Sequence, residues 1–354
     1  MADPQARHPE LAIAAQHDAA GRHDDAINAL ARGTRAGDAR CTMDLGLRLL
    51  AGDRAPLLPA QGLQFLLEAF EKGEAEAAAR AAGIIALGAN LPSNWTLALD
   101  WLQRSAAAGW APARQQLLAL CEDRKLAASA AAASRMDWRS VAAAVDLAAW
   151  RRAPAADIRS QEPRVSVFHD LIRPELCEFF ISLAPGRLEA ARVYDPVDRK
   201  DIVVAHRNNT QAIFGLTTVE VAHALLQARM AAACGIPALH MEAPAVLHYA
   251  PGEEIADHFD FVDPKTTPDY AGEIARNGQR IITFLVYLND DYDGGETDFP
   301  DLGITWKGRT GEGIYFVNAL KDLTPDLRMM HAGRPTTRGE KWLITQFIRS
   351  RPTR

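Results

Sequence analysis

Cysteine is scarce in this sequence, and its spacing argues against several classes of protein. The four residues, Cys41, Cys121, Cys177 and Cys234, stand singly and form no C-x-x-C pair. Isolated thiols of this kind disfavour a zinc knuckle, a redox dithiol and a disulfide framework.

Long apolar runs are missing as well. No stretch of about 18 uninterrupted apolar residues occurs, so we predict no membrane span. The first ten residues, MADPQARHPE, lack the basic and apolar regions of a signal peptide. We therefore expect a cytoplasmic protein that has no membrane partner.

An excess of positive charge is also absent. The formal net charge of the chain is −6, which disfavours a nucleic-acid partner but still allows a locally basic pocket for one small acid. A composition that is 48% hydrophobic and 24% charged excludes disorder, collagen and coiled coil as the dominant state. The length of 354 residues suits two domains.

The first 150 residues are rich in alanine and have a helical period. Gly37, Gly73 and Gly109 recur every 36 residues, and each lies between two apolar helical segments. A fixed period of this size is typical of a solenoid of helical hairpins, in which the glycine ends the first helix of each pair. We predict a helical repeat domain over residues 1–125 and a helical connector over 126–162. A generic helical bundle is the alternative.

The pattern changes after Pro163. Two helical stretches, Pro174–Leu183 and Thr218–Cys234, are followed by short alternating runs that are typical of strands. The expected strands include Ala245–Tyr249, Ile281–Leu288, Gly313–Val317 and Trp342–Ile348. Helices followed by many strands at hairpin spacing predict a β-sandwich or jelly roll with a helical buttress over residues 163–354.

Three residues of this second half could hold a metal ion. His258 and Asp260 stand two residues apart, so on a strand they would project from the same face. His331 lies on a later segment that resembles a strand. Two imidazoles and one carboxylate form the facial triad of non-heme iron(II), which leaves positions open for a chelating cosubstrate and dioxygen. The alternative is a solvated strand end that carries two polar residues.

Lys341 strengthens the metal-site interpretation. It stands ten residues after His331, at the entry to an apolar strand. A dicarboxylate that chelates a metal at one end needs a cation at the other. A buried lysine supplies that cation, and the ion pair reduces the cost of burying either charge alone.

Two stretches of the sequence resemble known families. Residues Ala81–Leu120 resemble the Sel-one-like repeat, a relative of the tetratricopeptide repeat. Residues 163–352 resemble the prolyl 4-hydroxylase-type 2-oxoglutarate/iron(II) oxygenases through three motifs, HYAPGEEIADHFDF, GQRIITFLVYLNDDYDGGETDFP and HAGRPTTRGEKWLITQFIR, which occur in the family's order.

This second resemblance implies a double-stranded β-helix and assigns roles to individual residues. The iron ligands would be His258, Asp260 and His331, and Lys341 would pair with the distal carboxylate of 2-oxoglutarate. Tyr249, Tyr287 and Thr345 would line the cosubstrate pocket. Arg280 would grip a substrate carbonyl near the mouth of the site. The implied cofactors are Fe(II), 2-oxoglutarate and O2, with ascorbate as a supporting reductant.

The sequence departs from the family at two substrate positions. Ile255 stands where these prolyl hydroxylases usually carry tyrosine, and Phe347 stands where they usually carry tryptophan. The pocket loses polar groups in this way, and polar contacts are what give sharp discrimination between substrates. The oxygenase chemistry is therefore better supported than proline as the target. We interpret residues Phe261–Gly278 as a lid, with a plain surface loop as the alternative.

The resemblance predicts hydroxylation of an unactivated C–H bond with release of succinate and carbon dioxide. We expect a peptidyl substrate, in which proline is one candidate residue, presented by the helical repeats. One alternative is a hydroxylase of a free amino acid or other small molecule, whose repeats dock a partner. A second alternative is a non-catalytic repeat scaffold. The oligomeric state is left open.

Overall fold

The computed structural model describes residues 8–132, 136–195, 200–202, 207–263, 265 and 269–353. The chain divides into two compact units. Unit 1 comprises residues 1–147 together with 215–225, and unit 2 comprises residues 148–214 together with 226–354. This division falls between the two predicted boundaries, at residues 125 and 162. In the described part of the chain, no helix is both long and apolar enough to cross a membrane.

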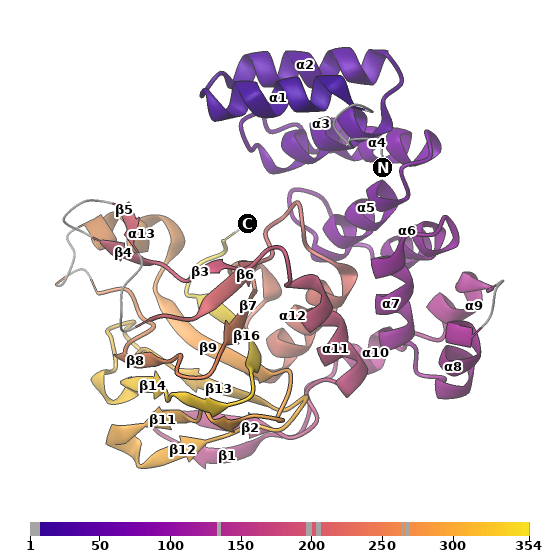
Figure 1. Cartoon of the computed structure of the whole chain (residues 1–354). Helices are drawn as coiled ribbons and strands as arrows, with labels where there is room; N and C mark the ends of the chain where they lie inside the picture. Colours follow the sequence, from indigo (N-terminus) through magenta and orange to yellow (C-terminus); the bar gives the residue numbers. More distant parts are fainter. Residues whose placement is uncertain are drawn as a thin grey trace. The chain divides into compact units, whose positions relative to one another are not determined.

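Unit 1 is built from helical hairpins, which Figure 1 shows in indigo and purple. Each helix packs on the next along the chain. The helices are α1 (Pro9–Ala19), α2 (His23–Arg35), α3 (Ala39–Ala51), α4 (Pro59–Glu71), α5 (Ala75–Leu87), α6 (Trp95–Ala107), α7 (Ala111–Leu120), α8 (Arg124–Ala132) and α9 (Trp138–Ala143). The predicted helical-repeat architecture is confirmed.

The three glycines of the 36-residue period lie in short turns between consecutive helices. Gly37, Gly73 and Gly109 have φ angles of 87°, 97° and 104°. They connect α2 to α3, α4 to α5 and α6 to α7. Glycine reaches this left-handed region without the steric penalty of a Cβ atom, so each helix ends here and the chain reverses.

The segment Gly215–Leu225 completes the core of unit 1, although it comes from the second half of the sequence. Glu220 accepts hydrogen bonds from Arg80 Nη1 at 2.8 Å and from Gln116 Nε2 at 2.7 Å. Burial raises the pKa of Glu220, and the charge of Arg80 opposes this effect. A Cβ atom on Gly83 would collide with the carbonyl of Val219, so only glycine permits this approach.

Unit 2 consists mainly of antiparallel sheets. The largest sheet has the strand order β1-β2-β13-β9-β16-β7-β6-β3, and a second sheet has the order β12-β11-β14-β8. Their strands are β1 (Asp157–Ser160), β2 (Val165–Phe168), β3 (Glu189–Ala190), β6 (Thr210–Ile213), β7 (Ala245–Tyr249), β8 (Ile255–His258), β9 (Arg280–Tyr287), β11 (Thr297–Phe299), β12 (Ile304–Trp306), β13 (Gly313–Val317), β14 (His331–Gly333) and β16 (Lys341–Arg349).

Two small ribbons and several helices complete this unit. The ribbons pair β10 (Asp293–Gly294) with β15 (Thr336–Arg338) and β4 (Val193–Asp195) with β5 (Lys200–Ile202). The α-helices are α10 (Leu147–Trp150), which begins at the last residue before the division, α11 (Pro174–Leu183), α12 (Val221–Cys234), whose first five residues belong to unit 1, and α13 (Asp269–Asn277). The 3₁₀ turns are η2 (Ala238–His240), η3 (Pro300–Leu302) and η4 (Leu327–Met329).

The core of unit 2 lies between the two larger sheets (Figure 1). Val165, Ile314 and Phe316 of the eight-stranded sheet form one buried cluster with Phe299 of the four-stranded sheet. Helix α12 reaches the opposite side of the large sheet through a hydrogen bond of 2.8 Å from Gln227 Nε2 to Gln346 Oε1 on β16. Two facing sheets with a helical buttress confirm the predicted jelly roll.

Candidate active site

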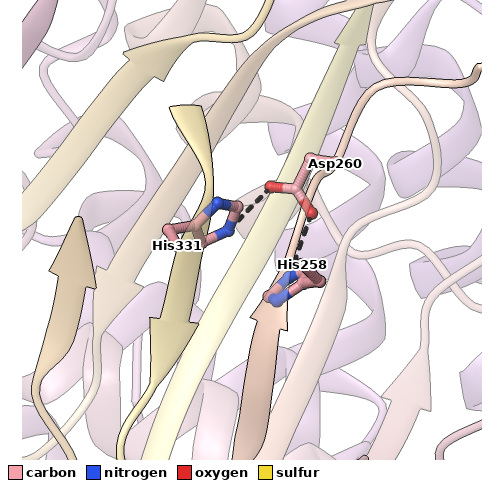
Figure 2. Close-up of side chains that lie close together, drawn as sticks. All are labelled: His258, Asp260 and His331. Carbon is pink, nitrogen blue, oxygen red and sulfur yellow. Dashed lines mark ion pairs between the residues drawn. The ribbon is translucent and has the colours of Figure 1, made fainter. Parts of the chain in front are cut away.

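Three potential metal ligands meet at one end of the four-stranded sheet. Strands β8 and β14 are antiparallel neighbours, and His258 lies directly opposite His331 in their register. Asp260 follows β8 by two residues. Figure 2 shows the three side chains pointing toward one another, and their potential ligand atoms all lie within 4.8 Å of each other. Among the described residues, this is the one group of at least three histidine, cysteine and acidic side chains with such a geometry.

The histidine rings are oriented by backbone carbonyls. His258 Nδ1 lies 2.9 Å from the carbonyl oxygen of Ala256, and His331 Nδ1 lies 3.0 Å from that of Met329. A carbonyl only accepts, so each Nδ1 carries a hydrogen, and Nε2 is the ring atom that faces the other residues of the triad. The two Nε2 atoms lie 3.5 Å and 3.3 Å from the oxygens of Asp260. This hydrogen-bonding pattern is typical of histidines that bind a metal through Nε2.

The carboxylate of Asp260 is held by a chain of hydrogen bonds. Thr283 Oγ1 donates to Asp260 Oδ2 at 2.8 Å, and Asn318 Nδ2 donates to Thr283 Oγ1 at 2.8 Å. Burial alone would raise the pKa of Asp260, but His331 and His258 hold it well below its usual range. Asp260 is therefore an anion with a defined orientation, as a metal ligand must be.

Lys341 is a buried cation whose one recorded hydrogen bond, among the described residues, goes to a backbone carbonyl. Its side chain is 1% exposed, and its Nζ donates to the carbonyl of Gly295 at 2.7 Å. Within the part of the chain that the structure describes, no carboxylate lies within ion-pair distance of this ammonium. Burial lowers the pKa of Lys341 to about 7. Such a group fits a ligand that brings its own carboxylate, because pairing would compensate the buried charge.

Two cavities meet at this site. The smaller, of about 50 Å³, contains the triad together with Lys341, and the larger has a volume of about 800 Å³. The residues that line both cavities are Arg207, Ile255, His258, Asp260, Thr345 and Phe347. A small chelating ligand on the Lys341 side and a larger ligand on the other side would therefore both reach the triad.

The structure places the residues predicted for the cosubstrate pocket in two different positions. Tyr249 and Thr345 line the small cavity, and Tyr249 lies opposite Lys341 in the pairing of β7 with β16. Of the described residues, Tyr287 lines neither cavity. Its hydroxyl lies 2.7 Å from Thr297 Oγ1, and it is Thr297 that lines the small cavity. Tyr287 is therefore buried next to the small cavity, with its ring centre 5.7 Å from Lys341 Nζ.

All three residues predicted for substrate binding line the larger cavity. Ile255 and Phe347 lie at its junction with the small one. Arg280 stacks on the Phe347 ring at 3.9 Å and donates two hydrogen bonds to Glu242, at 2.8 Å and 2.9 Å. The guanidinium of Arg280 is therefore held in place by a carboxylate and an aromatic ring.

Several residues of the cavity wall were not predicted from the sequence. Arg207, Glu242 and the helix α13 line the larger cavity, and α13 forms much of the segment interpreted as a lid or loop. Residues 264 and 266–268 of that segment lie outside the described residues. A signal was present for Thr283, a polar residue within the apolar run RIITFLVY. No motif marked Arg207 or Glu242.

Comparison with known proteins gives consistent results over the second half of the chain. Residues 244–349 match the 2OG-Fe(II) oxygenase superfamily. The chain is similar to prolyl 4-hydroxylase 1 of Arabidopsis thaliana, with 32% identity over 213 residues, which is 56% of this chain and 72% of that protein.

Two solved structures are similar to different parts of the chain. One is the viral collagen prolyl hydroxylase of Paramecium Bursaria Chlorella virus-1 in its 2OG complex, with 23% identity, a TM-score of 0.40, and coverage of 53% of this chain and 96% of that one. The other is a Sel1 repeat protein from Oxalobacter formigenes, with 27% identity, a TM-score of 0.27, and coverage of 31% of this chain and 92% of that one.

Proposed function

Because the chain belongs to the 2OG-Fe(II) oxygenase superfamily and has prolyl 4-hydroxylases among its relatives, we propose that it hydroxylates a residue within a peptide or protein, with proline as the first candidate. The enzyme uses Fe(II), 2-oxoglutarate and O2, as its family does. The observation that carries the proposal is the convergence of His258, Asp260 and His331 beside a cavity of about 800 Å³.

In this proposal the triad holds the iron. The Nε2 atoms of His258 and His331 and one oxygen of Asp260 are the ligands. Thr283 fixes the second oxygen of Asp260 through the hydrogen bond of 2.8 Å. Bound there, Fe(II) would activate O2 while 2-oxoglutarate is decarboxylated to succinate. The chain itself contributes the orientation of the ligands and the exclusion of water.

Lys341 holds the far end of 2-oxoglutarate in this proposal. Its ammonium pairs with the distal carboxylate, and Tyr249 and Thr345 form the adjacent wall of the small cavity. Burial raises the pKa of Tyr249, so its hydroxyl stays neutral and able to donate a hydrogen bond. Tyr287 would act indirectly, because its hydroxyl hydrogen-bonds to Thr297 and so helps to position that residue in the wall of the small cavity.

The target residue would lie between Ile255 and Phe347. Both side chains are apolar and line both cavities, so a pyrrolidine ring or another apolar side chain would fit between them. The size of the larger cavity favours a peptide over a free amino acid, because a single residue would fill only a small part of it. Apolar contacts discriminate weakly between substrates, so neighbouring residues must contribute to specificity.

The first prediction concerns the product. Proline-containing peptides incubated with Fe(II), 2-oxoglutarate and O2 should gain one oxygen atom per succinate formed, and free proline should react at least about tenfold more slowly in kcat/KM because it forgoes the peptide contacts. Mass spectrometry of the peptide and assay of succinate measure both quantities. Oxygenation of free amino acids with no reaction of any peptide would contradict the proposal and support the small-molecule alternative.

The helical repeats are proposed to hold a protein substrate. Leu57 and Leu58, between α3 and α4, are 54% and 45% exposed. Two adjacent exposed leucines add apolar area that a bound protein could cover. Stacked helical hairpins offer extended surfaces of this type to their partners.

The second prediction tests this surface. The double variant Leu57→Asp, Leu58→Asp should raise KM for a protein substrate about tenfold, because the apolar contact is lost, and leave 2-oxoglutarate turnover without substrate unchanged. Asp53→Ala in the same loop is the control, since its side chain is 66% exposed. An unchanged KM in the double variant would exclude these leucines from substrate binding.

A further inference from the structure

The larger cavity is rich in positive charge, although the chain as a whole has a formal net charge of −6. Four arginines line it: Arg192, Arg207, Arg276 and Arg280. Apart from Asp260 of the triad, the acidic residues of its wall are Glu242 and Glu273. The charge of this wall is therefore opposite in sign to the charge of the chain.

Both glutamates are already compensated. Glu242 accepts two hydrogen bonds from Arg280 and a third from Arg349 Nε. Arg349 Nη2 also donates to Glu273 Oε1. Burial alone would raise the pKa of Glu242, but Arg280 and Arg349 lower it, so this group remains a carboxylate. Two glutamates and two arginines thus balance one another.

The remaining three arginines of the wall are Arg192, Arg207 and Arg276. Within the described ranges, none of them forms an ion pair. The Nη2 of Arg207 donates to Gln211 Oε1 at 3.3 Å, whereas its buried Nε has no hydrogen-bond partner among the residues that the structure describes. Arg207 lines the wall of both cavities, so its charge is available to an anionic group of a bound ligand.

The positions of these arginines suit an extended ligand. Arg207 lines both cavities beside His258, whereas Arg192 and Arg276 line only the larger one. Apolar side chains complete the wall, including Phe259 and Phe261, whose stacked rings lie 4.7 Å apart. A ligand that uses all three cations must carry several anionic groups along a chain that also has apolar parts.

We propose that the substrate is an acidic peptide, in which aspartate or glutamate side chains flank the hydroxylated residue and pair with Arg207, Arg192 and Arg276. This inference rests on the proposed function and adds the charge of the substrate to it. A small free acid would engage one of these cations, and the 2-oxoglutarate carboxylate is assigned to Lys341. Charge complementarity of this kind determines which partners bind and how fast they associate.

The test is direct binding of matched peptides. Labelled peptides of equal length carry one central proline flanked by aspartate, asparagine or lysine, and are titrated with the Fe(II)- and 2-oxoglutarate-loaded protein without oxygen. Fluorescence anisotropy should show the aspartate peptide binding about tenfold more tightly than the asparagine peptide, with the lysine peptide weakest. The preference should shrink in about 0.5 M salt, because salt screens charges at the wall.

Two variants sharpen this test. The double variant Arg192→Gln, Arg276→Gln should bring the aspartate and asparagine peptides to within about threefold of each other. Arg338→Gln, whose side chain is 77% exposed and outside both cavities, should retain the full preference. Equal affinity for all three peptides, or tighter binding of the lysine peptide, would overturn the inference.

Turnover measured in parallel separates this inference from the proposed function. Tight binding of the aspartate peptide with no oxygenation of any peptide would contradict the proposed function, while the charge preference would stand. Oxygenation of all three peptides with equal affinity would contradict the charge preference, while the proposed function would stand.

Discussion

Replacement of His331 by alanine is expected to abolish both cosubstrate chelation and turnover. His331 is buried, and its Nε2 lies 3.3 Å from Asp260, so no other described side chain could take its place without a rearrangement. In the wild type, anaerobic addition of Fe(II) and 2-oxoglutarate should produce the weak visible charge-transfer band of the chelate. The variant should lack this band and should turn over at least about a thousandfold more slowly.

Two further variants make this result interpretable. His258→Ala removes a second proposed ligand that is more exposed than His331, so it tests the same site with less effect on the core. His169→Ala removes a half-exposed histidine of the same unit, which contacts Asp157 and Glu312 outside both cavities, and should leave the band unchanged. A band that persists in both ligand variants would mean that the iron binds elsewhere.

Replacement of Lys341 by methionine should weaken 2-oxoglutarate binding by about a hundredfold or more. The substitution would leave the distal carboxylate of 2-oxoglutarate buried without a cation. Loss of one partner of a buried ion pair typically costs about 2–5 kcal/mol. The result should be a higher KM for 2-oxoglutarate, measured by succinate release. Lys321→Met, in an exposed position, is the matched control. An unchanged KM for 2-oxoglutarate in the Lys341→Met variant would contradict the proposal that Lys341 binds the cosubstrate.

The same substitution should change the pH dependence of stability. Burial lowers the pKa of Lys341 to about 7, from a usual value of 10.5. The unfolded state therefore binds more protons than the folded state between about pH 7 and pH 10.5. In the absence of 2-oxoglutarate, Lys341 destabilises the folded state most below about pH 7, and this destabilisation decreases as pH rises through that window. Lys341→Met should raise the melting temperature more at pH 6 than at pH 9. A drop in melting temperature at both values would contradict this account.

The elements of the fold that depend on local pattern could be predicted closely. Helix α11 and strands β7 and β13 begin and end at the predicted residues, because their apolar runs are bounded by proline, glycine or polar residues. Strand β9 differs from its prediction by one residue at each end. Helix α12 begins three residues later than expected, at Val221.

The spacing of His258 and Asp260 predicted that they lie close together, although β8 ends at His258 and Asp260 follows it in a loop. The pairing of β14 with β8, which adds His331, is a long-range contact that the motif order indicated but no local rule encodes. Tyr287 illustrates the limit. Tyr287 lies two residues after Leu285, which lines the small cavity. The alternation of side chains along a strand predicts that both residues lie on the same face, but it does not predict where along the strand the cavity ends. Arg207 and Glu242 line the site through tertiary packing that no local pattern encodes.

The return of the chain to unit 1 at Gly215–Leu225 bears on how this protein could have evolved. A gene fusion that simply appended an oxygenase to a set of repeats would yield two independent modules. Here Glu220 is 2% exposed, and its partners Arg80 and Gln116 come from repeat helices. If the repeats were removed, Glu220 would either stay buried without its cation or become exposed to water and lose its packing contacts. The two parts of the gene should therefore be inherited together, and related proteins in which Arg80 is substituted should also have a substitution at Glu220.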